Sequence, residues 1–346
     1  MAYAAITKPS LHFNTITYTG TGSSNAVTGV GFQPDFIWFK CRSEAQNHNL
    51  FDAVRGSNKI IQSSTSNAEA TSTALLTSFD SDGFTVNTDD GVNGSSKTYA
   101  SWNWKANGAG SSNSDGSQSS TVSVNTTAGV SIVKFVNNTS YTANTFGHGL
   151  GAVPKVIMMR SLDDAYNWDF HHHTIAISKR LVLNSNAAQA NSTYMNSTSP
   201  TNQVFTVKSD EFGSNSNCIA YCFAEKKGFS KFGFYTSNNT ADNGPFVYTG
   251  FKPAFVLTKL STTGGADWRI FDNRRNTYNG DRQYLRPNNT DAESSGTSQI
   301  DLLSNGFKFR GPEGDSNYNT ETGIYMAFAA EPLVANVGNS IPATAV

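Results

Sequence analysis

Three consecutive histidines, His171-His172-His173, are the residues of this sequence whose type is most typical of a metal ligand. Neutral imidazole is the commonest metal-binding side chain in proteins. Consecutive residues of a β-strand point to opposite faces, so at most His171 and His173 could share one site. No cysteine or histidine elsewhere lies at a spacing typical of zinc. We therefore predict no metal site and interpret the cluster as an exposed polar strand or loop.

The acidic residues give no calcium-binding pattern and no catalytic motif. Asp80-Ser81-Asp82-Gly83 resembles the start of a calcium loop, but the later ligands and the terminal glutamate are absent, so we interpret it as a turn. The sequence also lacks a Gly-x-Ser-x-Gly elbow, a phosphate-binding loop, a dinucleotide fingerprint and a His-Glu-x-x-His motif. We predict no catalytic residue and no cofactor, and we do not expect an enzyme.

Aromatic side chains in segments that resemble loops could instead stack against sugar rings. Such a site combines an apolar plate with the short hydrogen-bonding groups of Asn, Asp and Ser. Trp168 and Trp268 fall at matching points of two repeated units, which favours a role in the core. The remaining candidates for a glycan-facing site are Tyr166, Tyr278, Tyr284 and Tyr318.

The chain that positions these residues repeats itself. A ten-residue motif, G-x-x-P-x-apolar-apolar-x-x-K/R, occurs at 31–40, at 151–160 and at 250–259. An acidic or amide residue follows each motif at a similar distance, and then come a Phe-led strand and a strand rich in aromatic residues and alanine. The acidic or amide residues are Glu69, Gln189 and Glu293. Such self-similarity indicates a tandem array of related domains.

The predicted fold is all-β, with three tandem antiparallel β-sandwich repeats of the jelly-roll or lectin-like kind. Short β-branched and aromatic runs alternate with Gly, Asn, Asp and Pro clusters, and each motif proline stands directly before a strand that we expect to be buried. The Gly- and Ser-rich linker predicts that repeat 1 moves more freely than repeats 2 and 3. The predicted segments are an N-terminal arm at 1–15, repeat 1 at 16–106, the linker at 107–121, repeat 2 at 122–226, repeat 3 at 227–334 and a C-terminal tail at 335–346.

Charged positions that recur in the repeats are better explained by the fold than by catalysis. A catalytic site built from carboxylates needs two groups in different environments, and the recurring acids near Asp52, Asp169 and Asp272 give no such asymmetric pair. This argument also disfavours a polysaccharide-cleaving enzyme. We predict structural ion pairs of Arg55 with Asp52 and of Arg274 with Asp272.

Composition excludes several classes of partner. The formal net charge is −1 and charged residues make up 15% of the chain, against about a quarter in ordinary soluble domains. Without a basic run, the sequence predicts no binding to nucleic acid or to an anionic membrane. The N-terminus lacks the apolar core of a secretory signal and no apolar run approaches a membrane span, so we expect cytoplasmic synthesis and no membrane insertion. We interpret Cys41, Cys218 and Cys222 as small packing residues.

Six segments carry a resemblance to a known family. They are 7–15, 29–40, 49–56, 78–84, 102–106 and 341–345. Together they resemble a family of virion structural proteins that is abundant in tailed bacteriophages of marine bacteria, including cyanobacteria, and the likeness covers nearly the whole chain. The resemblance implies a capsid-associated or tail-associated component with sandwich domains. It supplies no catalytic or ligand-binding residue.

The sequence and the resemblance together lead to one prediction and one alternative. The prediction is a non-enzymatic structural component of a bacteriophage virion, a tail, fibre or capsid-decorating protein. It would act by assembly with other virion proteins, as a homo-oligomer such as a trimer, after synthesis in the host cytoplasm without a signal peptide. The alternative is a receptor-binding protein that recognises a host surface glycan through loop aromatics.

Overall fold

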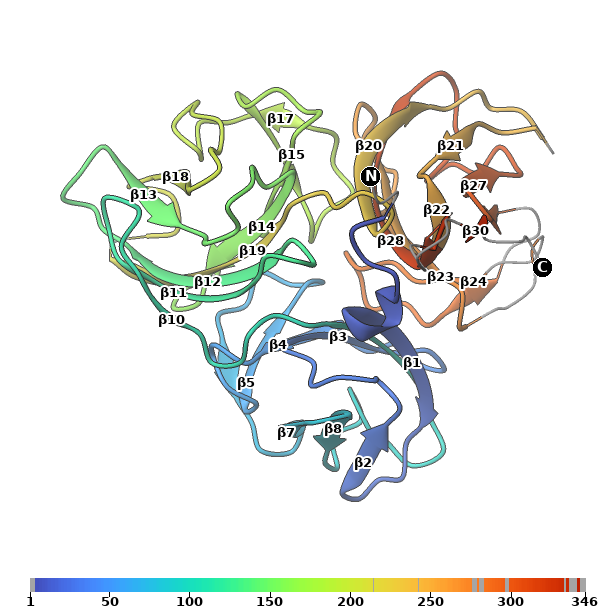
Figure 1. Ribbon diagram of the computed structural model, residues 1–346, viewed down its shortest axis with the longest axis horizontal. Helices are drawn as coiled ribbons and strands as arrows, with labels where there is room; N and C mark the ends of the chain where they lie inside the picture. The colour runs from blue at the N-terminus through green and yellow to red at the C-terminus, as the bar shows by residue number, and fades with distance from the viewer. Residues whose placement is uncertain are drawn as a thin grey trace.

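The structure is a computed structural model that describes residues 4–213, 215–241, 243–275, 279, 283–295, 299–332, 334–335 and 341–342. The chain is all-β with antiparallel sheets, as predicted. Among the residues just named, the one helix is the short 3-10 helix η1 (Pro9–Leu11). Figure 1 shows three lobes that surround a common centre, with repeat 1 in blue, repeat 2 in green and repeat 3 in orange.

Each lobe pairs a larger sheet with a smaller one. In repeat 1 the larger sheet has the order β1 (Phe13–Thr19), β9 (Thr98–Trp104), β3 (Phe36–Cys41), β4 (Asn49–Asp52), β5 (Lys59–Gln62), β6 (Ala70–Thr71), and the smaller sheet has the order β2 (Asn25–Thr28), β8 (Gly83–Val86), β7 (Leu76–Asp80).

Repeat 2 has the same plan, with two strands added at one edge. Its larger sheet has the order β10 (Ser111–Asn113), β11 (Ser120–Asn125), β12 (Val130–Asn137), β19 (Ser216–Phe223), β14 (Val156–Ser161), β15 (Asp169–His172), β16 (Lys179–Val182), β17 (Ala190–Asn191), and its smaller sheet pairs β13 (Ala143–Gly147) with β18 (Val204–Lys208).

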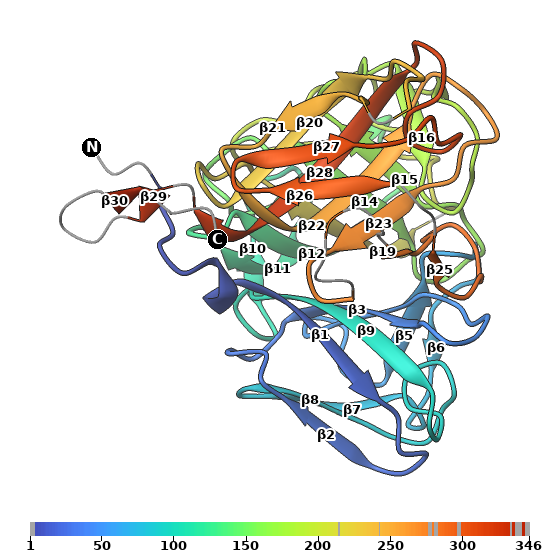
Figure 2. The ribbon, with the colours of Figure 1, turned by 90° about the vertical axis from the view of Figure 1, so that its right-hand side faces the viewer.

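Repeat 3 closes the series. Its larger sheet has the order β20 (Ser230–Thr236), β28 (Thr322–Pro332), β22 (Phe251–Leu260), β23 (Arg269–Asp272), and its smaller sheet has the order β21 (Phe246–Tyr248), β27 (Gly306–Phe309), β26 (Ile300–Leu303). Two further pairs are β24 (Gln283–Tyr284) with β25 (Ser294–Ser295) and β29 (Val334–Ala335) with β30 (Ile341–Pro342), the latter projecting from the body in Figure 2.

The strand of each repeated motif is buried on both faces. All six residues of β3 are buried, and so are all six of β14, which explains why these segments read as continuous apolar runs rather than as an alternation. One face of each larger sheet packs on the smaller sheet of its own repeat. The other face packs on the two neighbouring repeats, in one core that all three share.

Aromatic rings fill this shared core. Trp104 of repeat 1, Phe223 of repeat 2 and Phe328 of repeat 3 occupy matching positions, because each pairs with the sixth residue of its motif, which is Phe36, Val156 or Phe255. The ring centres of Phe223 and Phe328 lie 6.2 Å and 5.7 Å from that of Trp104. Each fully buried large side chain contributes about 2–3 kcal/mol, so the three sandwiches depend on one another for stability.

Repeat 1 is therefore not the free domain that the linker composition predicts. Its larger sheet packs into the shared core, and the linker lies against repeat 2, where β10 and β11 extend the larger sheet. β1 begins at Phe13, within the predicted N-terminal arm. The three cysteines are buried and unpaired. Within the described part of the chain, no helix is long and apolar enough to cross a membrane.

Candidate functional site

The cation that ends each repeated motif reaches into the preceding repeat, and for repeat 1 the preceding member of the ring is repeat 3. Lys40, Arg160 and Lys259 are all fully buried. Lys40 Nζ donates to the carbonyl of Thr290 at 3.0 Å, in repeat 3. Arg160 donates to the carbonyl of Ser66 at 2.9 Å, in repeat 1, and Lys259 to that of Asn186 at 3.4 Å, in repeat 2. These acceptors occupy equivalent positions, so the three contacts run head to tail around a closed ring.

A main-chain hydrogen bond accompanies each cation. The N–H groups of Glu69, Gln189 and Glu293 donate, each at 2.8 Å, to the carbonyl two residues beyond the motif cation of the neighbouring repeat. The two landmarks that recur in the sequence, the motif cation and this acidic or amide residue, thus lie on opposite sides of the same contact. We call each contact between two repeats a joint.

Two of the joints contain a buried charged triad. In repeat 1, Arg55 Nε donates to Asp52 at 2.5 Å and its Nη1 to Glu69 at 3.0 Å. Tyr221 of repeat 2 donates its hydroxyl to the same Asp52 at 2.7 Å. The predicted pair of Asp52 and Arg55 is therefore confirmed, and Tyr221 extends it across the joint.

The triad of repeat 3 uses a different arginine from the predicted one. Arg275, not Arg274, donates to Asp272 at 2.5 Å and to Glu293 at 2.9 Å. Its place three residues after the aspartate lets the turn bring the guanidinium back over the carboxylate. Trp102 of repeat 1 donates its indole N–H to Asp272 at 3.0 Å, whereas Arg274 lines a groove beside η1.

Repeat 2 replaces the whole triad by neutral residues. His172 pairs with Val156 as Asp52 pairs with Phe36, so the prediction that Asp169 matches the other two aspartates is wrong. Ile175 follows three residues later, and Gln189 stands at the third position. His172 Nε2 donates to the carbonyl of Tyr325 in repeat 3 at 3.2 Å. Where repeat 2 lacks one charged residue of the triad, it also lacks the charged partners, because a buried charge without a counter-charge is costly.

Electrostatics differ between the triads and the motif cations. Burial alone raises the pKa of Asp272, but the Arg275 guanidinium and its hydrogen bonds outweigh this and hold the pKa below its usual value. The two motif lysines donate to main-chain carbonyls, and burial lowers the pKa of Lys40 and that of Lys259 to about 8. Burial and then the charge of Arg55 lower the pKa of Arg160 to about 10.

Two of the three histidines are buried rather than exposed, whereas His173 is exposed. His171 and His172 are 6% and 1% exposed, because β15 lies between its own sandwich core and repeat 3. Burial lowers the pKa of His171 to about 4 and that of His172 to about 3. The rings of His172 and His173 stack with their centres 5.2 Å apart, and His173 directly follows the last residue of β15. Among the described residues, no three His, Cys, Asp or Glu side chains form a group that could hold a metal ion.

The predicted tryptophans and acidic turn have structural roles. Trp168 and Trp268 are fully buried, and their indole N–H groups donate to main-chain carbonyls of the preceding repeat, at 2.8 Å for Gln62 and 3.1 Å for Val182. The Asp82 carboxylate accepts the N–H of Gly31 at 2.6 Å, at the start of the first motif. The core role of the tryptophans and the turn role of the acidic segment are therefore confirmed.

The structure describes three of the four predicted tyrosines, and these three differ in exposure. Tyr166 is half-buried against Phe212. Tyr284 is 8% exposed and lies between two guanidinium groups, with Arg269 4.1 Å and Arg286 5.0 Å from its ring centre, so the expectation of an exposed ring is wrong there. Tyr318 is 44% exposed. Tyr278 lies outside the described residues.

Three exposed aromatic residues in repeat 3 were missed by the sequence analysis. Phe234 on β20 is 62% exposed, and Phe246 and Tyr248 on β21 are 46% and 48% exposed. The sequence analysis considered only aromatic residues in segments that resemble loops, and it overlooked these three because they lie on strands. Comparison of the repeats could have found them, since the residues paired at matching positions in repeat 2 are Lys134, Thr145 and Gly147.

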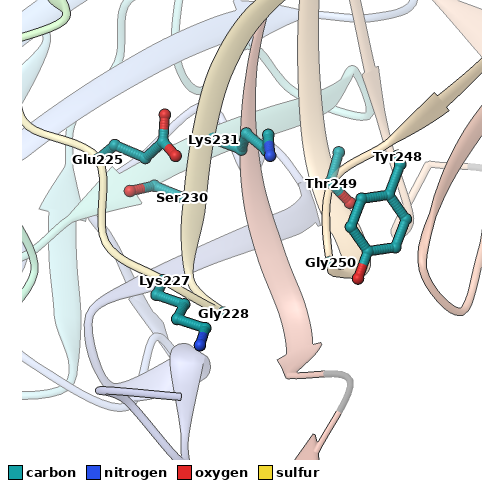
Figure 3. A pocket seen from close by; sticks show the side chains of 8 residues that line it. All are labelled: Glu225, Lys227, Gly228, Ser230, Lys231, Tyr248, Thr249 and Gly250. Atoms are coloured by element: carbon teal, nitrogen blue, oxygen red, sulfur yellow. The ribbon is translucent and has the colours of Figure 1, made fainter. Parts of the chain in front are cut away.

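A small pocket adjoins Tyr248. Its volume is about 150 Å³, and it is lined by Glu225, Lys227, Gly228, Ser230, Lys231, Tyr248, Thr249 and Gly250. Figure 3 shows the Lys231 side chain directed towards Thr249 and Tyr248, and Lys231 Nζ lies 5.9 Å from the Tyr248 ring centre. A larger groove of about 400 Å³ separates η1 from repeat 3.

Comparison with known proteins identifies the family but no activity. The chain belongs to the family described as a domain of unknown function (DUF7483), whose model matches residues 8–332. No curated protein and no solved structure matches the chain. The matched region includes the three repeats and their joints.

Proposed function

We propose that this protein is a non-enzymatic structural component of a bacteriophage virion, a tail, fibre or capsid-decorating protein that acts by binding other virion proteins. The observation that carries the proposal is the ring of three sandwiches, closed within one chain by equivalent joints. Head-to-tail contacts that close leave no repeat loosely attached, which suits a rigid particle component. The resemblance of the motif segments to phage virion proteins supports the same role.

The ring also bears on how the chain would assemble further. The surfaces that form the head-to-tail joints are buried inside the ring. Contacts with other molecules must therefore use the outer sheets, the loops and the sheet edges. We propose a symmetric homo-oligomer, with a trimer as the arrangement that matches the threefold plan of the chain. The protein would be made in the host cytoplasm and reside in the virion.

The first experiment determines the mass of the purified protein by light scattering and then maps particles with and without it. A fixed number of copies per particle, with density lost from the head or the tail when the protein is removed, is the expected result. Loss of fibre or tail density would give a tail role, and loss from the shell would give a decorating role. Particles in which mass spectrometry finds no copy of the chain would refute the proposal.

Recognition of a host surface glycan is the alternative, and the exposure of Tyr318 favours it. Tyr318 is 44% exposed and is followed by the exposed residues Asn319 and Thr320, an apolar ring beside short hydrogen-bonding groups that suits a sugar. Under this alternative, Tyr318→Ala removes attachment to the host while particles stay intact. Tyr141→Ala, at an exposed tyrosine of repeat 2, is the matched control. Normal attachment by both variants would exclude the alternative at this residue.

A further inference from the structure

One polar side chain in each repeat contacts the loop that follows β8, β18 or β27. Asn49, Asp169 and Arg269 occupy matching positions, since each stands three residues before the partner of the sixth motif residue. The loops include residues 87–97, 209–213 and 310–321, and we call each of them a closing loop. The three repeats therefore offer a direct comparison of how this loop is held.

Repeats 1 and 3 hold the closing loop with matched groups. Asn49 Nδ2 donates to the carbonyl of Gly91 at 3.2 Å, and Asn49 Oδ1 accepts from Gln62 at 3.1 Å. Arg269 donates to the Asp315 carboxylate at 2.7 Å. The loop is thus held by a neutral amide in repeat 1 and by an ion pair in repeat 3.

Repeat 2 instead places two carboxyl groups against each other. Asp169 is 1% exposed, and Glu211 of the closing loop lies within hydrogen-bonding reach of it. One guanidinium serves both, because Arg180 Nη1 donates to Asp169 at 2.8 Å and to Glu211 at 2.9 Å. Among the described residues, no group donates to the buried Asp169 Oδ2, and the buried Tyr194 hydroxyl donates to neither acid. A proton on one of the two carboxyl groups would supply the hydrogen that this contact lacks.

Electrostatics favour such a proton. Two carboxylates in contact destabilise each other, and a pair of this kind takes up one proton between them. Burial and then the charge of Glu211 raise the pKa of Asp169 well above its usual value, although Arg180 opposes the shift. The protonated pair is therefore the form that the folded structure stabilises.

The other titratable groups around the pair do not replace this proton. Burial raises the pKa of Tyr194, in the loop between β17 and β18, so its hydroxyl stays protonated. His171 lies on the same face of β15 as Asp169, and it is neutral near pH 7 because burial lowers its pKa to about 4. Lys208 at the end of β18 pairs with the exposed Asp210 at 2.8 Å. Within the described part of the chain, Arg180 is the one cation that forms an ion pair with Asp169.

The closing loop of repeat 2 is strained next to Glu211. Phe212 has a φ of 68°, in the left-handed region that bulky side chains rarely adopt. Its ring is 1% exposed and packs in the core of the repeat 2 sandwich. Burial of this ring and the contacts of Glu211 hold the conformation against its cost. Loss of the contacts at Glu211 would let the loop relax.

We propose that the closing loop of repeat 2 is a pH-sensitive latch, fastened by one proton that Asp169 and Glu211 share. With the proton in place, one carboxyl group donates to the other and Arg180 balances the remaining negative charge. When the pH rises and the proton passes to water, two carboxylates face a single cation. Residues 209–213 then detach and expose Phe212. This inference does not depend on the proposed virion role.

The direction of the pH dependence follows from the sign of the shift. A carboxyl group whose folded pKa is raised holds its proton more tightly when the loop is closed. Closure is therefore strongest below the ordinary aspartate pKa of about 3.9 and weakens as the pH rises through the folded value. Asp169→Asn gives repeat 2 the residue that repeat 1 has at this position. Its amide can donate to Glu211 and accept from Arg180 at any pH.

Hydrogen exchange of the full-length protein, followed by mass spectrometry, measures the latch. The quantity is the protection of residues 209–213 relative to an unstructured chain at the same pH. We expect this protection in the wild type to fall at least about tenfold between about pH 5 and about pH 9, since one pKa unit corresponds to a factor of ten. D169N and E211Q should keep it nearly constant. Asp210→Asn is the matched control, because it changes an exposed carboxyl group of the same loop and should retain the wild-type pH dependence.

Several outcomes would overturn the inference. One is equal protection of residues 209–213 at both pH values in the wild type. Another is a pH dependence as large in D169N and E211Q as in the wild type, or low protection at every pH in both variants. Loss of the pH dependence in D210N would assign it to the exposed pair with Lys208. Protection restored at the higher pH by millimolar calcium chloride would place a metal ion, and not a proton, between the carboxyl groups. Thermal unfolding confirms that each variant is folded, and either of the two amide variants decides the test if the other is not.

Discussion

Substitution of one residue in a charged triad should cost more than neutralisation of the whole triad. Arg55 is 1% exposed in its side chain, as Asp52 is 0%. Its guanidinium donates to Asp52, to Glu69, to the carbonyls of Leu50 and Lys59 and to the Tyr221 hydroxyl. Arg55→Ile removes all of these bonds and leaves a buried carboxylate without its counter-charge.

The magnitude follows from the burial of the pair. Removal of one partner of a buried ion pair typically costs about 3–5 kcal/mol, and we expect R55I to lie in this range. The triple variant D52N/R55I/E69Q carries no uncompensated charge, and repeat 2 has Ile175 and Gln189 at two of these positions. The side-chain amide that D52N introduces can accept from the turn N–H groups through its oxygen and donate to the Tyr221 hydroxyl through its nitrogen, so we expect the triple variant to cost about 1–2 kcal/mol.

The assay is urea unfolding followed by tryptophan fluorescence, with the free energy of unfolding and its urea dependence fitted together. Lys208→Met is the control, because the pair of Lys208 and Asp210 is exposed and its loss should leave the free energy of unfolding nearly unchanged. A loss of unfolding free energy below about 1 kcal/mol in R55I would refute the reasoning. A triple variant less stable than R55I would also refute it, because the argument holds that a buried charge must be removed together with its partner.

Three further predictions concern the other joints and the linker. Burial holds the pKa of His172 at about 3, below its unfolded value of about 6.5. The stability it contributes is therefore complete above pH 6.5 and falls as the pH drops, by at most about 3 kcal/mol at pH 4.5, and His172→Asn should reduce this loss. Burial likewise holds the pKa of Lys40 and Lys259 at about 8, so stability should rise between pH 7.5 and 9.5 by about 1–2 kcal/mol for each lysine, and K40M/K259M should flatten the rise. Gly147→Val should displace Asn113, whose side chain leaves no room for a Cβ atom, and so speed proteolysis between residues 108 and 118.

Each of these predictions has a measurement and an outcome that would contradict it. Urea unfolding at each pH measures the free energy of unfolding for the first two predictions. If this free energy changes with pH as steeply in His172→Asn as in the wild type, the first prediction is contradicted. An unchanged slope in K40M/K259M would contradict the second. Limited proteolysis with mass spectrometry tests the third against Gly314→Val, since no heavy atom outside the immediate neighbours lies within 4 Å of a Cβ built on Gly314, and Gly314 does not have a positive φ. Equal cleavage in both glycine variants would show that the linker does not depend on Gly147.

Comparison of the repeats could predict much of the fold, because periodicity and residue type are local properties. The run from Phe36 to Phe39 is apolar at every position, which already indicates a strand buried on both faces. The recurrence of Glu69 and its counterparts indicated a structural role, which the joints confirm. The exposed positions of Phe246 and Tyr248 were accessible to the same comparison, since one repeat departs there from the others.

Other features depended on contacts between residues far apart in the chain. Whether Arg274 or Arg275 pairs with Asp272 depends on the path of a turn, which spacing alone does not specify. The burial of His172 depends on repeat 3 packing against β15. The linker composition predicted freedom, yet the linker is held because β13 offers an open edge and a glycine.

The sequence by itself determined the all-β class, the threefold repetition and the motif whose strand is buried. Those features follow from local periodicity, from turn residues and from the similarity of one segment to the next. Only the tertiary structure decided that the repeats close into a ring, that Lys40, Arg160 and Lys259 each contact the preceding repeat of the ring, and that one joint is neutral. Burial of a charge and the partner it requires depend on how separate segments meet in space, and a single repeat does not contain that information.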